Sequence, residues 1–164
     1  MTSAHLIEET DRQLTPAQQS ALARQLLARL LADRYGISPL PAITVTATGK
    51  PYFASHPAIH FSLSHCPRAV MAVISDAPVG CDIEEVQTDA PPELLQAAFS
   101  PAEQTRIAEA ATPTLELTRI WTRKEAYVKR TGSIPDDPVD WPSEMPGVST
   151  VCEVAKGYVY SISR

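Results

Sequence analysis

The sequence lacks several features that would each place it in a broad class of protein. Its longest apolar run, Ala69–Ile74, is far shorter than the about 20 residues that cross a bilayer. Its beginning carries acidic residues and no basic segment followed by an apolar one, so we expect no signal peptide. Its 14 basic residues are outnumbered by 19 acidic ones, whereas a general nucleic-acid surface needs a basic excess. We therefore expect a cytoplasmic protein that binds neither membranes nor nucleic acids.

Cysteine is also scarce. Cys66, Cys81 and Cys152 are odd in number and far apart, which argues against a disulfide framework and against a zinc site. We expect all three to be reduced and to pack in the interior. What the chain does have is 164 residues with 44% hydrophobic content, enough to bury a core in one compact unit or in two small packed halves.

Local patterns predict several helices. Thr15-Pro16-Ala17-Gln18 is a capping box with proline at the first helical position, and leucines then recur at helical spacing until Gly36. A second capping box, Ser100-Pro101-Ala102-Glu103, begins another helix. Two more helices are predicted, a short one from Pro92 to Phe99 and a long one from Leu115 to Thr131, which Gly132 ends.

Alternating and continuous apolar segments predict strands. Single strands are expected at Ile43–Ala47, Ile59–Leu63, Ala69–Ser75 and Val79–Glu84. A loop rich in proline and aspartate, Ser133–Pro146, precedes two segments that read as a hairpin, Val148–Val154 and Tyr158–Ser163. Helices and strands arranged in this way indicate an α+β fold.

Two carboxylates share one face of the predicted strand Val79–Glu84. The period of two places Asp82 and Glu84 on the same side of the strand. Carboxylate oxygens are ligands that Mg²⁺ accepts, together with water and substrate phosphates. The pair alone is a weak signal, because acids in this spacing also occur at the solvated ends of many strands.

A further carboxylate, Glu125, lies on the predicted long helix. It shares a stripe with Leu117, Trp121 and Val128, and a carboxylate among apolar neighbours needs a partner. Lys129, one turn further on, offers an i, i+4 ion pair, which is common on helices and is worth about 0.2–0.5 kcal/mol. That local pair does not explain the apolar stripe, so a site that also includes other segments stays open.

A third segment, Phe61-Ser62-Leu63-Ser64-His65, completes a set of three motifs. The other two are Gly80-Cys81-Asp82-Ile83-Glu84 and Trp121-Thr122-Arg123-Lys124-Glu125-Ala126-Tyr127-Val128-Lys129. In this order and at this spacing they resemble the motifs of the 4′-phosphopantetheinyl transferases of the surfactin-synthetase-activating (Sfp) type. The resemblance runs from about Thr15 to Arg164, nearly the whole chain.

The resemblance implies a reaction and a set of site residues. The reaction is transfer of 4′-phosphopantetheine from coenzyme A to a serine of an apo acyl or peptidyl carrier protein, with release of 3′,5′-ADP. The implied ligands of Mg²⁺ are Asp82, Glu84 and Glu125. Glu125 would also accept the serine proton, and Lys129 would bind and stabilise the phosphoryl oxygens. The implied contacts with coenzyme A are Ser64 and His65 at the 3′-phosphate and Lys50, in the turn Gly49-Lys50-Pro51, near the nucleotide.

The resemblance also implies an architecture, a pseudo-twofold pair of small α/β halves. Residues 1–75 would form the half that binds the 3′-phosphate and adenine, and residues 76–164 the half that carries the metal and the catalytic groups. Glu103 matches a further acid that the family has near the metal, although the capping box with Ser100 explains it locally.

The start of the chain departs from the family pattern. The chain is shorter there than Sfp-type enzymes, the first strand of the family has no clear counterpart, and Gln19 stands where a phosphate-binding arginine is expected. An open sheet edge is a pairing hazard, so we expect either Ala4–Glu8 to cover it as a short strand or the chain to self-associate. We favour the covered monomer. Because carrier proteins are acidic like this chain, we also expect a basic patch around the long helix, made of Arg119, Arg123, Lys124 and Arg130.

Two other classes of function remain open. One is a metal-dependent phosphodiesterase or nuclease, against which the net charge of −5 and the Ser64-His65 pair count. The other is a non-catalytic relative that binds coenzyme A or a carrier protein, against which the retained acids and Lys129 count. The sequence does not select among carrier proteins of fatty-acid, polyketide and peptide synthesis.

Overall fold

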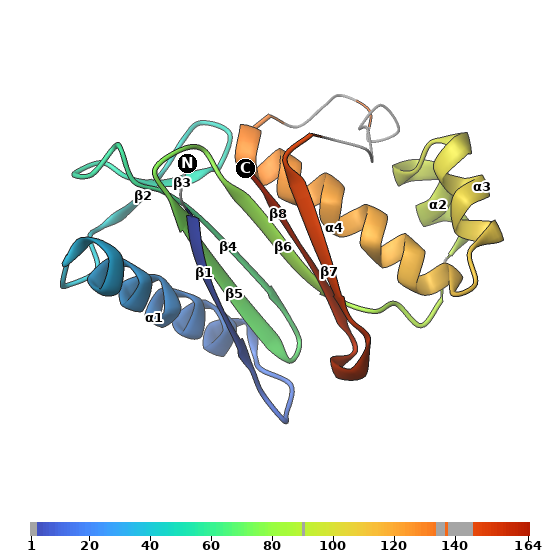
Figure 1. Ribbon diagram of the computed structural model, residues 1–164, viewed down its shortest axis with the longest axis horizontal. Coiled ribbons are helices and arrows are strands. Elements are labelled where there is room, and N and C mark those ends of the chain that lie inside the picture. The colour runs from blue at the N-terminus through green and yellow to red at the C-terminus, as the bar shows by residue number, and fades with distance from the viewer. Residues whose placement is uncertain (1–2, 90, 134–136, 138–145) are drawn as a thin grey trace.

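Two three-stranded antiparallel sheets form the middle of the molecule, and helices lie at its two ends (Figure 1). The computed structural model describes residues 3–89, 91–133, 137 and 146–164. The first sheet has the order β1 (Ser3–Glu9), β5 (Ala69–Ser75), β4 (His60–Cys66). The second sheet has the order β6 (Gly80–Glu85), β8 (Tyr158–Ser163), β7 (Val148–Glu153). The predicted α+β class is confirmed.

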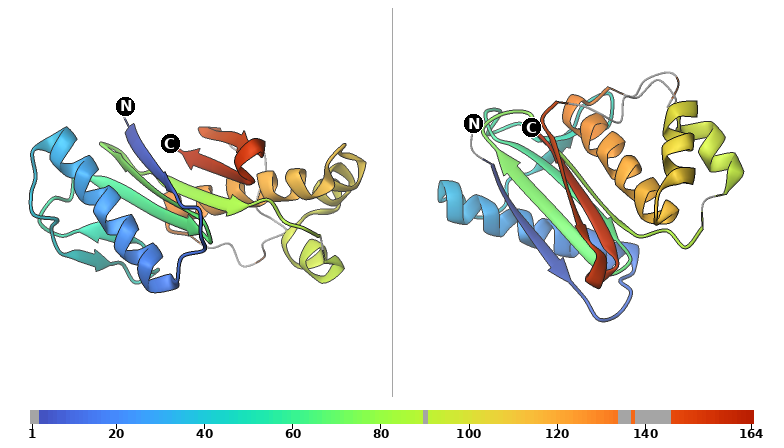
Figure 2. Two further views of the ribbon diagram at one scale, coloured as in Figure 1. Left: turned by 90° about the horizontal axis from the view of Figure 1, so that it is seen from below. Right: turned by 45° about the vertical axis from the view of Figure 1, so that its right-hand side comes forward.

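The helices and a small ribbon complete the fold (Figure 2). The helices are α1 (Pro16–Tyr35), α2 (Pro92–Ala98), α3 (Pro101–Glu109) and α4 (Pro113–Thr131). A ribbon pairs β2 (Ile43–Val45) with β3 (Pro51–Phe53), and a 3-10 helix, Val154–Lys156, lies in the turn of the predicted hairpin. The predicted loop Ser133–Pro146 lies largely outside the described residues. None of the helices in the described residues is long and apolar enough to cross a membrane.

α1 forms as its sequence predicts. The Thr15 hydroxyl accepts the N–H of Gln18, and the Gln18 side chain accepts the N–H of Thr15 at 2.9 Å. Gly36 ends the helix in the left-handed region at φ 65°, where glycine is favoured. Its leucine stripe packs on the first sheet, and each buried leucine contributes about 1.5–3 kcal/mol.

β5 is the central strand of the first sheet, and all seven of its residues are buried. Its alternation divides them between two hydrophobic clusters. Val70, Ala72 and Ile74 pack with α1, whereas the intervening Met71 and Val73 pack with β6 and β8. The continuous apolar run in the sequence therefore reflects a strand that is covered on both faces.

β1 covers the edge of β5 that was expected to lie open. It pairs antiparallel with β5 from Ser3, opposite Ser75, to Glu9, opposite Ala69. The expectation that Ala4–Glu8 forms a strand is confirmed. Contacts beyond the sheet hold β1 in place, since Glu9 accepts a hydrogen bond from Tyr158 at 2.7 Å. Whether the chain is a monomer stays a prediction.

β6 and α4 approach each other unusually closely at Gly80. A Cβ atom on Gly80 would lie 2.0 Å from the carbonyl oxygen of Ala126 and 2.4 Å from the backbone nitrogen of Arg130. The strand therefore rests directly on the helix backbone, which only glycine permits. This contact sets the distance between the acids of β6 and the polar side chains near the end of α4.

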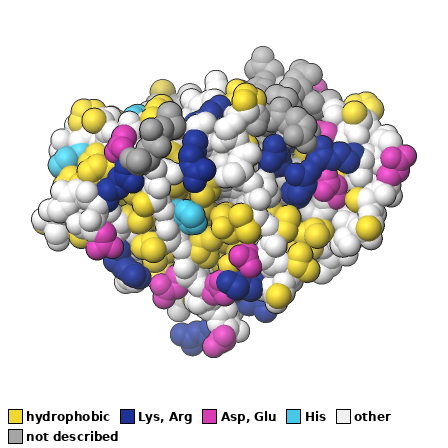
Figure 3. All heavy atoms as spheres, viewed as in Figure 1, with side chains coloured by type: hydrophobic (Ala, Val, Ile, Leu, Met, Phe, Trp, Pro, Cys, Tyr) yellow, Lys and Arg dark blue, Asp and Glu magenta, His cyan; other side chains and the backbone are white. Residues whose placement is uncertain are grey.

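The prediction that four basic side chains form a surface patch around α4 is wrong for two of them, Lys124 and Arg123, which are buried. Lys124 is fully buried, donates to Glu103 Oε2 and to the carbonyl oxygen of Ala98 at 2.7 Å each, and lies over the Phe99 ring. Arg123 is also buried and donates to Thr150. The basic side chains that do gather on the face seen in Figure 3 have acidic ones beside them.

Two other expectations about burial also need correction. The stripe of α4 that carries Trp121, Glu125 and Val128 is half-buried, and the buried face of the helix is a different one. Of the cysteines, all of which are free, Cys66 and Cys81 are buried as expected but Cys152 is exposed on β7. No residue of β7 is buried, so the strand contributes nothing to the interior there.

Candidate active site

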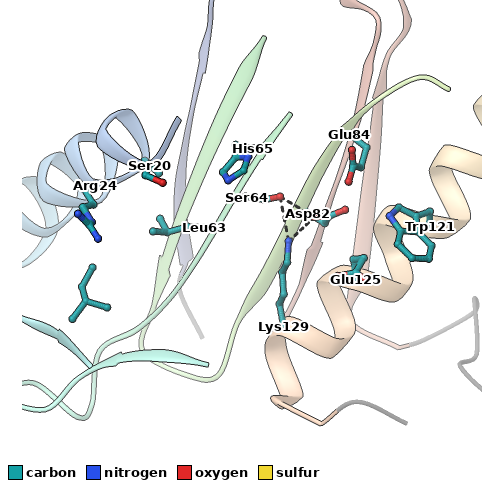
Figure 4. Close-up of a pocket in the computed structure, with 12 residues that line it drawn as sticks. Ser20, Arg24, Leu63, Ser64, His65, Asp82, Glu84, Trp121, Glu125 and Lys129 are labelled. Atoms are coloured by element: carbon teal, nitrogen blue, oxygen red, sulfur yellow. Dashed lines mark hydrogen bonds and ion pairs between the residues drawn. The ribbon is translucent and has the colours of Figure 1, made fainter. Parts of the chain in front are cut away.

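A cavity of about 490 Å³ lies between α1, β4, β6 and α4, and it brings the three sequence motifs together (Figure 4). Six predicted site residues line it: Ser64, His65, Asp82, Glu84, Glu125 and Lys129. Two more side chains reach it from α1, Ser20 and Arg24, and Trp121 joins them from α4. The motifs are far apart in the sequence, so their convergence is a property of the fold.

Each element presents its side chains through its own periodicity. Asp82 and Glu84 face the cavity from alternate positions of β6, as predicted. His65 lies within β4, because this strand runs on to Cys66 and does not end at Leu63 as expected. On α4, Glu125 and Lys129 are one turn apart and both face the cavity.

Asp82, Ser64 and Lys129 form one hydrogen-bonded cluster (Figure 4). Lys129 Nζ lies 2.6 Å from Asp82 Oδ1 and 3.2 Å from Ser64 Oγ. The Ser64 hydroxyl donates to the same Asp82 oxygen at 2.8 Å and accepts the backbone N–H of Ile83. The ion pair of Lys129 therefore joins the helix to β6, in addition to any local interaction with Glu125.

The acids of the cavity perturb one another. Burial and the neighbouring Asp82 raise the pKa of Glu84 to about 7. The same two causes raise the pKa of Glu125. Burial opposes the charge on Lys129, but Asp82 outweighs it and raises the pKa of the ammonium group. The cavity thus concentrates negative charge that one lysine does not fully balance.

The donor set fits a magnesium ion. Asp82 Oδ2 is buried and has no hydrogen-bond partner among the residues that the structure describes, so one carboxylate oxygen is left for a ligand. Glu84 and Glu125 line the same cavity and offer further oxygens, which are the ligands that Mg²⁺ prefers. Within the described ranges, no three acidic or imidazole side chains already converge as a ligand set.

Arg24 and Ser20 were not predicted as site residues. They are one helical turn apart on α1, on either side of Ala23, which also lines the cavity. The i, i+4 spacing of two polar side chains beside the apolar stripe was the available signal. Which side of the helix faces β4, however, depends on packing that the sequence does not reveal.

Lys50 lies apart from the other predicted residues. Its ammonium group donates to the carbonyl oxygens of Lys129, at 2.7 Å, and of Arg130, near the end of α4. A cation is favourable there because helix C-termini carry partial negative charge. Lys50 lines a neighbouring, mostly apolar cavity of about 240 Å³. A contact with the nucleotide stays a prediction.

Glu103 and Gln19, which the family resemblance places near the metal and the phosphate, make structural contacts. Glu103 closes the capping box with Ser100 and pairs with the buried Lys124, which confirms the local explanation of this acid. Gln19 is buried and donates to the carbonyl oxygen of Cys66 at 3.0 Å, so it ties α1 to the end of β4. Neither side chain lines the cavity in the part of the chain that the structure describes.

An α+β fold whose cavity gathers three acids, a lysine and a histidine is the arrangement that the motifs imply. A family model described as the 4′-phosphopantetheinyl transferase superfamily matches residues 78–144. The 4′-phosphopantetheinyl transferase AcpT of Salmonella typhi is 37% identical over 136 residues, which cover 80% of this chain and 70% of the relative. The chain therefore belongs to the 4′-phosphopantetheinyl transferase superfamily.

Two further relatives agree with this assignment. AcpT of Escherichia coli (strain K12) is 40% identical over 114 residues, which cover 66% of this chain and 57% of the relative. The 4′-phosphopantetheinyl transferase psf-1 of Bacillus pumilus is 33% identical over 129 residues, which cover 76% of this chain and 54% of the relative.

Proposed function

We propose that this chain transfers 4′-phosphopantetheine from coenzyme A to a serine hydroxyl of an apo acyl or peptidyl carrier protein and releases 3′,5′-ADP. The observation that carries the proposal is the cavity that Asp82, Glu84, Glu125 and Lys129 line together. The names of the relatives support it, because each is called a 4′-phosphopantetheinyl transferase.

Magnesium is part of the proposal. The ion would be held by Asp82 through its unpartnered Oδ2, by Glu84 and by Glu125. Bound there, it would neutralise charge on the pyrophosphate of coenzyme A as the leaving group departs.

The protein's own groups have distinct tasks in the proposed reaction. The serine oxygen forms a bond to the phosphorus next to the pantetheine, and the bond from that phosphorus to 3′,5′-ADP breaks. Glu125, directly or through a water, accepts the serine proton from its place on the cavity wall. Lys129, kept protonated by Asp82, stabilises the charge on the phosphoryl oxygens.

Two side chains on the other wall of the cavity, Arg24 and His65, suit the phosphates of coenzyme A. His65 and Arg24 both line it and are both exposed, so they are accessible to a ligand. The planar guanidinium of arginine can bind a phosphate through two hydrogen bonds. Arg24 thereby supplies the positive charge that a phosphate-binding arginine at the position of Gln19 would supply.

We further propose that residues 1–75 and 76–164 form two α/β halves related by a pseudo-twofold axis. Each half contains a three-stranded sheet and a long helix, α1 in the first and α4 in the second. The boundary falls between β5 and β6, and the cavity lies where the two meet.

The direct test is incubation of the purified chain with an apo-carrier protein, coenzyme A and Mg²⁺, followed by mass spectrometry of the carrier. We expect the carrier mass to increase by one 4′-phosphopantetheine group, and chelation of the metal to prevent it. A stable complex without a mass change would instead favour the non-catalytic relative. In a second incubation with DNA and Mg²⁺, cleavage of the DNA would favour the nuclease.

A further inference from the structure

The first and second sheets meet along β4 and β6 through side chains. In the described residues, backbone ladders join β4 to β5 and β6 to β8, and the two sheets remain separate. Across the gap, Ser62 Oγ accepts the N–H of Cys81 at 3.1 Å, and Ser64 Oγ accepts the N–H of Ile83 at 3.2 Å. In a continuous sheet, backbone carbonyl groups of β4 would accept these N–H groups of β6. Here two serine hydroxyls accept them instead.

The spacing of these bonds explains why they occur as a pair. Ser62 and Ser64 point to the same side of β4, and the N–H groups of Cys81 and Ile83 point to the same edge of β6. From the first bond to the second, the chain moves on by two residues in β4 and by two residues in β6. The two strands therefore run parallel at this junction, with the same rise per residue. A shift of either strand would leave two buried N–H groups without acceptors.

Ser64 does more than its neighbour. Its hydroxyl donates to Asp82 Oδ1 at 2.8 Å and accepts from Lys129 Nζ at 3.2 Å, in addition to the N–H of Ile83. A serine hydroxyl has one proton and two lone pairs, so its hydrogen-bonding capacity is fully used. The side chain is also buried, with 6% of its surface exposed.

We propose that Ser64 is a positioning residue, which rests on the proposed function. It fixes Asp82 Oδ1 and Lys129 relative to each other and to the backbone of β6, while Asp82 Oδ2 has no hydrogen-bond partner among the described residues and would be left for a cation. The 3′-phosphate contact predicted for Ser64 would require one of these three bonds to break. The junction between the sheets and the geometry of the reacting groups therefore depend on the same hydroxyl.

The test compares Ser64→Ala with Ser62→Ala, which is a matched control. Each variant removes one hydroxyl of the junction, but among the described residues neither Asp82 nor Lys129 is a hydrogen-bond partner of Ser62. We expect Ser64→Ala to lower kcat for carrier modification roughly 10- to 100-fold, as loss of a residue that hydrogen-bonds to a metal ligand does, without raising KM for coenzyme A. Ser62→Ala should keep the parent kcat. Ser64→Thr, which retains the hydroxyl, should restore most of the rate.

Two binding and exchange measurements accompany the kinetics. Amide hydrogen exchange should accelerate at Ile83 in Ser64→Ala and at Cys81 in Ser62→Ala. Calorimetry with coenzyme A and with 3′-dephospho-coenzyme A should give Ser64→Ala the parent preference between the two ligands, because the hydroxyl is not assigned to the 3′-phosphate.

Several outcomes would overturn the inference. Equal losses of kcat in Ser62→Ala and Ser64→Ala would reduce Ser64 to a structural role. A lost preference for coenzyme A over its dephospho form would make the hydroxyl a ligand contact. A parent chain that modifies no carrier would refute the proposed function instead, and unchanged exchange at Ile83 in Ser64→Ala would then refute the positioning role separately.

Discussion

At the scale of single residues, Asp82 divides its two oxygens between two tasks. Oδ1 is committed to Ser64 and Lys129, and Oδ2 is buried without a partner among the described residues. Asp82→Asn keeps the shape of the side chain but removes the charge that a metal needs. We expect the rate of holo-carrier formation to fall roughly 10²–10³-fold, as it does on loss of one electrostatic group in a site.

Glu85 provides the matched control for this prediction. It lies on the same strand but pairs with Arg68 at 3.1 Å on another surface. Glu85→Gln should therefore transfer 4′-phosphopantetheine at the parent rate. If Asp82→Asn also kept that rate while both variants melted like the parent, Asp82 would not be a metal ligand.

Glu84 gives the metal-free protein a distinctive pH dependence. Burial and Asp82 raise its pKa in the folded state to about 7, from an ordinary value of 4.5, so the folded chain binds this proton more tightly than the unfolded chain does. The contribution of Glu84 to stability is therefore fully present below pH 4.5 and is lost as the pH rises through 7. Unfolding by denaturant at several pH values, with a chelator present, should show this decline.

The substitution Glu84→Gln and the addition of Mg²⁺ separate this effect from other titrations. The variant cannot ionise at this position, so the difference between the parent and variant curves should show the decline from pH 4.5 to 7. Bound Mg²⁺ favours the ionised carboxylate and should reduce the difference. Parallel curves for parent and variant would mean that Glu84 titrates as an ordinary surface acid.

At the scale of elements, the contact between β6 and α4 depends on Gly80. A Cβ atom there would lie 2.0 Å from backbone, and backbone cannot move aside as a flexible side chain can. We expect Gly80→Ala to destabilise the fold by about 1–3 kcal/mol, as overpacking does. It should also slow transfer, because moving α4 away from β6 lengthens the 2.6 Å contact between Lys129 and Asp82.

Gly36→Ala is a control that strains the backbone without crowding. Gly36 has φ 65°, and a Cβ atom there would meet no described atom within 4 Å. We expect a loss of about 1–2 kcal/mol in stability and an unchanged rate. Denaturant midpoints and initial rates of the two variants check both statements. A Gly80→Ala chain with parent stability and rate would show that α4 tolerates displacement.

At the scale of the whole molecule, the elements that could be predicted are those with local signals. The capping boxes at Thr15 and Ser100 specify where two helices begin, because their hydrogen bonds lie within one turn. β5 was evident from its apolar run, since a strand covered on both faces has little choice of residue. The three motifs likewise identified six residues that line one cavity.

The features that were missed depend on partners far along the chain. The short β3 was not foreseen, because it is three residues long and pairs with β2 across a turn. Lys124 was placed on the surface because its acceptor, Glu103, belongs to another helix. Arg24 and the serine junction between β4 and β6 required knowledge of which faces meet.

The alternation of β5 has a consequence for how the chain unfolds. One cluster contains Val70 and Ile74 and the other contains Met71 and Val73, so both interiors share a single strand. Unfolding of β5 removes buried side chains from both hydrophobic clusters at once. Neither cluster can therefore unfold while the other stays intact. The two clusters should therefore be lost in one calorimetric transition, even though the sequence divides into two halves between them. Two resolved transitions would show that the shared strand does not couple them.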